Sequence, residues 1–195
     1  MCEPGPTESD VAFNYGSTTD REAHSLVCGA ARPGARARRC FDECVKEPVS
    51  PAEVDEWVAF IKSRGVGAVV SLLTADEVGR TYAPPGIEAK MAEAFGEDHY
   101  HHFDLNGGAS PAEVLAAIEA EVAAGRKTVV HCWGGGGRTG LVQAAWLARK
   151  EELSAADAAA AVVEHAKVLG VPRRVDVAAL QAFLDKAGAP VGAAV

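Results

Sequence analysis

The order of apolar and polar residues along the chain predicts buried strands that alternate with amphipathic helices. Residues 66–73 form a continuous apolar run, which is typical of a parallel strand buried on both faces. Shorter patterns predict strands at residues 127–131, 99–103 and 24–29. Because helical patterns separate these runs, the chain is predicted to form an α/β fold with a central, largely parallel sheet flanked by helices.

Helices are predicted where apolar residues recur every three or four positions. Ser50 and Ser110 each precede the residues Pro-Ala-Glu, so both stretches carry a capping box with proline at the first helical position. Gly65 and Gly96 stand where two of these patterns stop. The predicted helices, including one short turn at 75–80, cover residues 51–64, 75–80, 87–95, 110–122, 138–151, 154–168 and 175–186.

Both ends of the chain lack these patterns. Residues 1–20 are polar and rich in turn formers, so we expect a flexible N-terminal segment, and we expect residues 188–195 to form a flexible tail. Residues 21–187 contain no internal repeat and no linker. At 195 residues, with 48% hydrophobic content, the chain is therefore expected to fold around a single globular domain.

The charge and the cysteine content narrow the functional classes. A net charge of −8 argues against nucleic acid and anionic membranes as main partners, and no run approaches the roughly 18 apolar residues of a membrane span. The acidic start resembles neither a secretory signal nor a transit peptide, which favours a cytoplasmic location. The five cysteines are then expected to be reduced, and Cys40 and Cys44 lack the second pair that a metal site would need.

The candidate chemistry lies in residues 127–140. They predict a strand, a loop that is nearly all glycine and then a helix, with Cys132 at the loop's entrance and Arg138 at its exit. Main-chain amides of glycines can turn inward to form an anion nest, and the start of the following helix adds positive potential. Arg138 can bind two oxygens of a phosphate. In this field Cys132 is expected to be a thiolate, a nucleophile placed for attack at phosphorus.

These residues resemble the signature His-Cys-x5-Arg-Ser/Thr of the cysteine-dependent protein tyrosine and dual-specificity phosphatases. The matching residues are His131, Cys132, the loop of residues 133–137, Arg138 and Thr139. Further segments follow the order found in small relatives of kinase-associated phosphatase, so the resemblance covers about residues 25–185. It implies a protein tyrosine phosphatase-like fold and makes residues 21–187 a dual-specificity phosphatase-like catalytic domain.

The resemblance also implies a role for each matching residue. Cys132 attacks phosphorus and forms a cysteinyl-phosphate, Arg138 clamps the phosphate oxygens, and the Thr139 hydroxyl bonds the sulfur and makes it a better leaving group. His131 fixes the loop through backbone hydrogen bonds and is not the base. No metal or other cofactor is required. The main-chain amides expected to bind the phosphate are those of Trp133, Gly134, Gly135, Gly136, Gly137 and Arg138.

Asp104 is the candidate general acid. The family supplies the leaving oxygen's proton from an aspartate on a mobile loop roughly thirty residues before the cysteine. Asp104 ends the predicted strand 99–103, so it is expected at the carboxyl edge of the sheet. Its surroundings resemble the family's Asp-x-x-x-Pro loop, although Pro111 lies further away than usual. The alternative interpretation of Asp104 is a turn former. Asp98 is the competing candidate for the general acid, but it falls at the start of the strand, on the wrong edge of the sheet.

The loop's composition limits the substrate. Its five residues carry no charge, which favours a phosphomonoester over substrates with several phosphates. A phosphorylated protein, with phosphotyrosine or phosphoserine/threonine, is therefore the expected substrate and partner. The alternatives are a phosphatase of a soluble sugar or inositol phosphate, a phosphoprotein-binding pseudophosphatase, and a rhodanese-like sulfur transferase. These residues do not identify the partner, the pathway or the oligomeric state.

Several further residues have two interpretations each. The four arginines within residues 32–39 indicate either a solvated loop or a surface that attracts a phosphorylated partner. Gln181 is either a helix-surface residue or a water-positioning residue. Cys28, Cys40 or Cys44 could act as a resolving thiol for an oxidised Cys132.

The three histidines near Asp104 are also ambiguous. His99 and His101 share one face of the predicted strand, and His102 faces the other way. Three ligands therefore do not converge from this strand, and packing or surface roles are favoured over a metal site.

Overall fold

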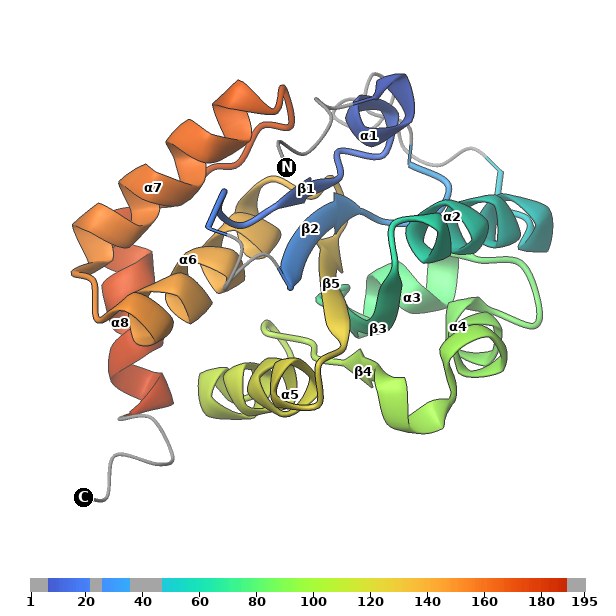
Figure 1. Ribbon diagram of the computed structural model, residues 1–195. Coiled ribbons are helices and arrows are strands. Elements are labelled where there is room, and N and C mark those ends of the chain that lie inside the picture. Colours follow the sequence, from blue (N-terminus) through green and yellow to red (C-terminus); the bar gives the residue numbers. More distant parts are fainter. Residues whose placement is uncertain (1–6, 22–25, 36–46, 189–195) are drawn as a thin grey trace.

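The computed structural model describes residues 7–21, 26–35 and 47–188 (Figure 1). In chain order the elements are α1 (Glu8–Ala12), β1 (Gly16–Ser17), β2 (Val27–Ala31), α2 (Pro51–Ser63), β3 (Val66–Ser71), α3 (Ala75–Thr81), α4 (Ile87–Phe95), the 3-10 turn η2 (Glu97–His99), β4 (Tyr100–His102), α5 (Pro111–Ala123), β5 (Lys127–Cys132), α6 (Gly137–Glu151), α7 (Ala155–Val168) and α8 (Val177–Ala187).

The strands form one sheet in the order β1-β2-β5-β3-β4. Only β1 pairs antiparallel, with β2, and the other three pairings are parallel. The register places Ala31 beside Cys132, and Ser71 beside both His131 and His102. The four parallel strands therefore end at one edge of the sheet, where ligands bind in folds of this kind. The predicted α/β architecture is confirmed.

Helices cover both faces of the sheet, and each face has its own core (Figure 1). Val130 belongs to the core shared with α5, α6, α7 and α8, whereas Val129 belongs to the core shared with α2 and α4. Neighbouring residues of a strand point to opposite faces, which is why the central strands are apolar at successive positions. The fully buried Trp146 and Trp57 lie one on each side.

Local sequence signals explain most element boundaries. The Ser50 and Ser110 side chains cap α2 and α5, each in a capping box with a glutamate, as predicted. The short turn expected at 75–80 is a full helix, α3, because Thr74 caps it in the same way. Strand β4 is shorter than predicted since η2 occupies its first part, and α8 begins later because Asp176 caps it.

The expectation of a flexible start is wrong for residues 7–20. Thr7 and Asp10 form a capping box that begins α1. Phe13 and Tyr15 are buried, and the Phe13 ring lies 4.6 Å from that of Phe60 on α2, centroid to centroid. These apolar side chains join the core and hold the segment against the sheet. Residues 1–6 and 189–195 lie outside the described part of the chain.

The remaining predictions concern membrane spans and the cysteine and arginine clusters. None of the helices in the described ranges has both the length and the apolar character that a bilayer crossing requires. The cysteines at positions 2, 40 and 44 and the arginines at positions 36, 38 and 39 lie outside the described residues.

Candidate active site

Cys132 is the last residue of β5, at the edge where the parallel strands end. Its side chain is buried, and the Thr139 hydroxyl donates a hydrogen bond to its sulfur at 3.1 Å. Thr139 lies in the first turn of α6, directly after Arg138. The predicted order of strand, glycine loop (residues 133–137) and helix is therefore observed, and so is the predicted contact between Thr139 and the sulfur.

The middle of the glycine loop packs directly on the end of β2. Gly135 has φ +73°, a conformation that favours glycine. A Cβ atom at this position would lie 2.7 Å from main-chain atoms of Ala30 and Ala31. Only glycine allows the loop to approach the neighbouring strand this closely.

Two segments from the ends of the chain fix the outward side of the loop. The Asn14 side-chain amide donates to the Gly134 carbonyl at 2.8 Å, and the Arg174 main-chain N–H donates to the Gly136 carbonyl at 3.1 Å. In a trans peptide the C=O and the next N–H point in opposite directions. Holding the Gly134 carbonyl therefore turns the N–H of Gly135 away from Asn14.

Arg173 is a buried cation that organises this support. Its guanidinium donates to the Gln143 side chain at 2.7 Å and to the side-chain and main-chain oxygens of Asn14 at 2.9 and 3.0 Å. Its remaining acceptors are the carbonyls of Val171 and Pro172, so all of these hydrogen-bond partners are neutral.

Burial lowers the pKa of Arg173 to about 10, whereas the nearby Cys132 acts in the opposite direction. Arg173 is thus charged at neutral pH. The side chains of Arg173, Gln143 and Thr139 all crowd Gly29, where a Cβ would lie within 2.7 Å of each. Thr139 in turn binds the cysteine sulfur, so the buried guanidinium packs against side chains that contact Cys132.

Arg138 is held by a carboxylate that the sequence did not single out. Its two terminal nitrogens donate to the two oxygens of Glu77 at 2.7 Å each, and Nη1 also donates to the Leu72 carbonyl at 2.7 Å. Arginine has five N–H donors. The donors on Nε and the second one on Nη2 have no acceptor among the described residues. They lie on one edge of the guanidinium, which is the geometry that suits two phosphate oxygens.

Glu77 is itself fixed by α3. Its carboxylate accepts the Thr74 main-chain N–H at 2.7 Å within the capping box of the helix. Burial would raise the pKa of Glu77, but the hydrogen bonds from Arg138 and Thr74 outweigh it and lower the pKa. The pattern Thr74-x-x-Glu77 was the available sequence signal, and it indicated only a helix start.

Asp104 follows β4 at the predicted edge, but its carboxylate is engaged in the loop itself. One oxygen accepts the Ala75 N–H at 2.8 Å, and the other accepts the N–H groups of Asn106 and Gly107 at 2.9 and 2.8 Å. These bonds, led by that from Ala75, lower the pKa of Asp104. In this arrangement Asp104 is a turn former that joins the loop to α3. Asp98 lies in η2, before β4, as expected.

His131 is fixed by packing beside the start of the glycine loop. Its ring is fully buried and meets the Trp57 ring edge-on, with the centroids 5.4 Å apart. A hydrogen bond with the Cys132 main chain acts to raise the pKa of His131, but burial outweighs it. Burial lowers the pKa of His131 to about 3, so the ring is neutral and a very weak base. Its exclusion as the general base is consistent with this environment.

Arg32 does not belong to a solvated loop. The residue is 4% exposed, and its guanidinium stacks over the Trp133 ring at 4.0 Å from the centroid. The arginine packs against the first residue of the glycine loop, because a cation can rest on the face of an indole.

The three histidines divide between two faces, as predicted. His99 and His101 both contact one oxygen of Glu121, while His102 contacts the Leu73 carbonyl. Burial works against ionisation of Glu121, but hydrogen bonds from Arg126 and the two histidines lower its pKa to about 2. Within the described ranges, no group of three or more histidine, cysteine or acidic side chains is arranged to hold a metal ion.

Cys28 cannot reach Cys132 in this arrangement. It pairs with Val129, three residues before Cys132, which corresponds to about 10 Å along the strand and to the opposite face. A disulfide requires Cα atoms within about 7 Å. Cys28 instead accepts a hydrogen bond from the Tyr15 hydroxyl at 3.3 Å. Gln181 is exposed and bonds Asp185 on its own helix, as expected of a surface residue.

A cysteine at the end of a parallel strand, a threonine on its sulfur, and an arginine across a glycine loop define a cysteine-dependent phosphatase of the protein-tyrosine/dual-specificity class. The family model described as cyclin-dependent kinase inhibitor 3 (CDKN3) matches residues 41–159, more than half of the chain. The chain belongs to this family of dual-specificity phosphatases. No match was found among curated proteins.

Solved structures of other proteins have the same fold. Kinase-associated phosphatase, with its catalytic-site cysteine replaced by serine, has a TM-score of 0.66 at 20% identity, covering 97% of this chain and all of the other. PTPMT1 in complex with PI(5)P has a TM-score of 0.58 at 14% identity, covering 89% and 94%. The active form of Tk-PTP has a TM-score of 0.55 at 22% identity, covering 93% and 97%.

Proposed function

We propose that this protein hydrolyses phosphomonoesters on proteins through a cysteinyl-phosphate on Cys132, without a metal ion. The observation that carries the proposal is the pairing of Arg138 with Glu77, which orients the arginine while two donors on its other edge stay available. A phosphate placed there would also face the glycine loop and the start of α6. The main-chain amides of residues 133–138 and the helix dipole then supply the remaining positive potential.

In the first step the Cys132 thiolate attacks phosphorus. A sulfur–phosphorus bond forms, and the bond from phosphorus to the ester oxygen breaks with its electron pair on that oxygen. Arg138 stabilises the charge on the phosphoryl oxygens, and Asn14, held by the buried Arg173, keeps the glycine loop in place. The leaving oxygen takes up a proton, for which Asp104 is the proposed donor. To serve, the carboxylate has to exchange its three main-chain hydrogen bonds for a proton.

In the second step water attacks phosphorus and the sulfur leaves as a thiolate. The Thr139 hydroxyl, 3.1 Å from the sulfur, stabilises the departing anion. Asp104 would now accept the proton of the attacking water. Inorganic phosphate is released and Cys132 returns to its starting state.

The proposed substrates are phosphotyrosine, phosphoserine or phosphothreonine side chains. The family consists of phosphatases of phosphorylated proteins, and the glycine loop has no cation that would select a second phosphate. Because PTPMT1 is a fold relative bound to PI(5)P, a phosphoinositide belongs in the substrate panel. A catalytic thiolate requires a reducing compartment, so the proposed location is the cytoplasm.

The test is turnover of p-nitrophenyl phosphate, tyrosine and serine phosphopeptides, and soluble and lipid inositol phosphates. We expect the phosphopeptides to have the highest kcat/KM and Cys132→Ser to abolish turnover of every substrate. The Cys132→Ser protein is expected to retain phosphorylated partners in a pull-down. Retained turnover by Cys132→Ser would rule out the thiolate mechanism, and a preference for inositol phosphates would replace the protein substrate.

A further inference from the structure

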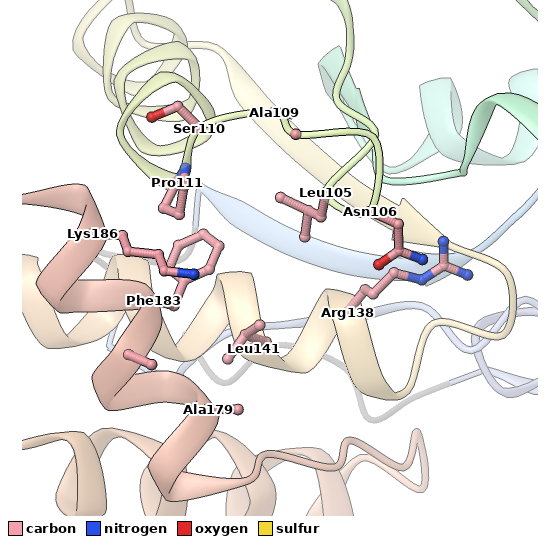
Figure 2. A pocket seen from close by; sticks show the side chains of 12 residues that line it. Leu105, Asn106, Ala109, Ser110, Pro111, Arg138, Leu141, Ala179, Phe183 and Lys186 are labelled. Carbon is pink, nitrogen blue, oxygen red and sulfur yellow. The ribbon is translucent and has the colours of Figure 1, made fainter.

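A pocket of about 530 Å³ opens beside Arg138, between residues 105–111 and α8. Figure 2 shows Arg138 and Asn106 at one end of this pocket and Lys186 at the other. The pocket therefore begins at the residue that is proposed to hold the phosphate. A substrate whose phosphate is bound there can place its neighbouring atoms in this space.

The inner surface of the pocket is apolar. Leu105, Leu141 and Phe183 lie between its two ends (Figure 2). On α8 the lining residues Ala179 and Ala182 are exposed and small, so the helix leaves space on this side. An apolar side chain that covers this surface makes binding more favourable than a charged side chain would.

The charges at the pocket are all positive. No aspartate or glutamate lines it, although the protein carries a net charge of −8. The two charged lining residues are Arg138 and Lys186, at opposite ends. Because Ala179 and Lys186 are seven residues apart on one helix, the pocket extends about 10 Å along α8. An extended peptide covers this length with about three residues.

We propose that the pocket binds the substrate peptide beside its phosphorylated residue, taking an apolar side chain near Leu105 and Leu141 and an acidic one at Lys186. This rests on the proposed function, since Arg138 must hold the phosphate. The acidic residue then stands about three positions from the phosphorylated one. A peptide fits these observations better than a lipid surface does, because a single lysine at the far end is a small attraction for an anionic membrane.

The first test is binding of phosphopeptides to the Cys132→Ser protein, measured by fluorescence anisotropy. The peptides carry leucine or glycine beside the phosphorylated residue, and glutamate or glutamine three positions away on either side. Tighter binding of the leucine peptides by about tenfold, and of the glutamate peptides by about threefold, is expected. Equal affinity of all peptides would overturn the proposal, and so would a preference for vesicles containing phosphoinositides.

Two variants in the same background locate the effect. Ala182→Trp fills the pocket and is expected to remove the preference for leucine, whereas Ala178→Trp, at an exposed position outside the lining, keeps it. Lys186→Glu is expected to reverse the preference for glutamate, and Lys167→Glu on α7 gives the same charge change without this effect. The readout is a ratio of affinities within one variant, so partial unfolding does not imitate it. A preference that survives Ala182→Trp would overturn the proposed site.

Turnover of p-nitrophenyl phosphate by the wild type separates this inference from the proposed function. If the wild type hydrolyses this small ester and the Cys132→Ser variant binds all peptides equally, the proposed function stands and the proposed peptide site is wrong. If the wild type shows no turnover and the Cys132→Ser variant still prefers the leucine and glutamate peptides, the peptide site stands and the proposed chemistry is wrong.

Discussion

The Glu77 carboxylate binds both terminal nitrogens of Arg138 at 2.7 Å, although the two residues are 61 positions apart. This pair fixes the plane of the guanidinium before any phosphate arrives. The orientation of the free edge, which carries the Nε donor and the second Nη2 donor, is thereby fixed. A preorganised donor pair stabilises charge without having to reorient during the reaction.

Replacing Glu77 is therefore expected to reduce activity through Arg138. Glu77→Gln keeps an oxygen for the Thr74 N–H but loses the two-point ion pair, and kcat/KM for p-nitrophenyl phosphate is expected to fall up to about 100-fold. Steady-state kinetics measure the effect. Glu113→Gln alters the equivalent capping box of α5, where the carboxylate accepts only the Ser110 N–H, and is expected to leave kcat/KM near the wild-type value. Equal losses in both variants would attribute the effect to helix capping.

Thr139 is expected to act in the second chemical step. Thr139→Val keeps the shape of this buried side chain but removes the hydroxyl that bonds the Cys132 sulfur. Loss of one such bond is expected to slow breakdown of the phosphoenzyme by about tenfold. Rapid-quench measurements would then show a burst and an accumulated cysteinyl-phosphate. Thr139→Ser restores the hydroxyl and is expected to abolish the burst; a burst that persists in it argues against this role.

Asp104 can be tested through the leaving group. A general acid contributes about 10²- to 10⁴-fold when the leaving oxygen is basic, so Asp104→Asn is expected to slow hydrolysis of a phosphoserine peptide far more than that of p-nitrophenyl phosphate. Asp98→Asn, before the same strand, is the control and is expected to change neither rate. If the rate of hydrolysis falls equally for both substrates, Asp104 instead shapes the loop through its three main-chain hydrogen bonds.

Arg173 is expected to support the glycine loop through Asn14. Its guanidinium donates to the side chain and the main chain of Asn14, whose amide holds the Gly134 carbonyl. Arg173→Gln removes this buried guanidinium, and kcat/KM for p-nitrophenyl phosphate is expected to fall about tenfold, equivalent to about 1.4 kcal/mol. Steady-state kinetics measure the effect, and Arg173→Lys, which retains the charge, should restore part of the rate. An unchanged kcat/KM in Arg173→Gln would argue against this support.

Glu121 makes the stability of the fold depend on acidic pH. Its pKa falls from 4.5 to about 2 in the folded protein, so its stabilising contribution is complete above the unfolded value and is lost as the pH falls toward 2. Glu121→Gln is therefore expected to lower the free energy of unfolding at pH 6, with a difference that shrinks between pH 4.5 and 2. Denaturant unfolding at several pH values measures this. Glu164→Gln, at an exposed site on α7, is expected to show no such trend.

Sequence patterns predicted the features that depend on neighbouring residues. The capping boxes at Ser50 and Ser110 fix local hydrogen bonding and appear where expected. The apolar run at 66–73 fixes burial, and β3 occupies its first six residues. The strand, glycine loop and helix around Cys132 are likewise contiguous, so their chemistry could be inferred before their geometry was known. Asp104 was placed at the right edge of the sheet for the same reason, because the ends of parallel strands meet there.

Only the tertiary structure decided which side chains support the site and which are engaged elsewhere. Asn14 reaches Gly134 across 120 positions and Arg173 reaches Asn14 across 159, and neither carries a local signal of this role. Asp104 had the expected spacing from Cys132, yet its carboxylate accepts a hydrogen bond from the main-chain N–H of Ala75, which belongs to a different element. Local patterns report backbone conformation and burial, whereas contacts between distant segments depend on how the elements pack. The sequence therefore determined the candidate nucleophile and its loop, and the fold determined the side chains that surround them.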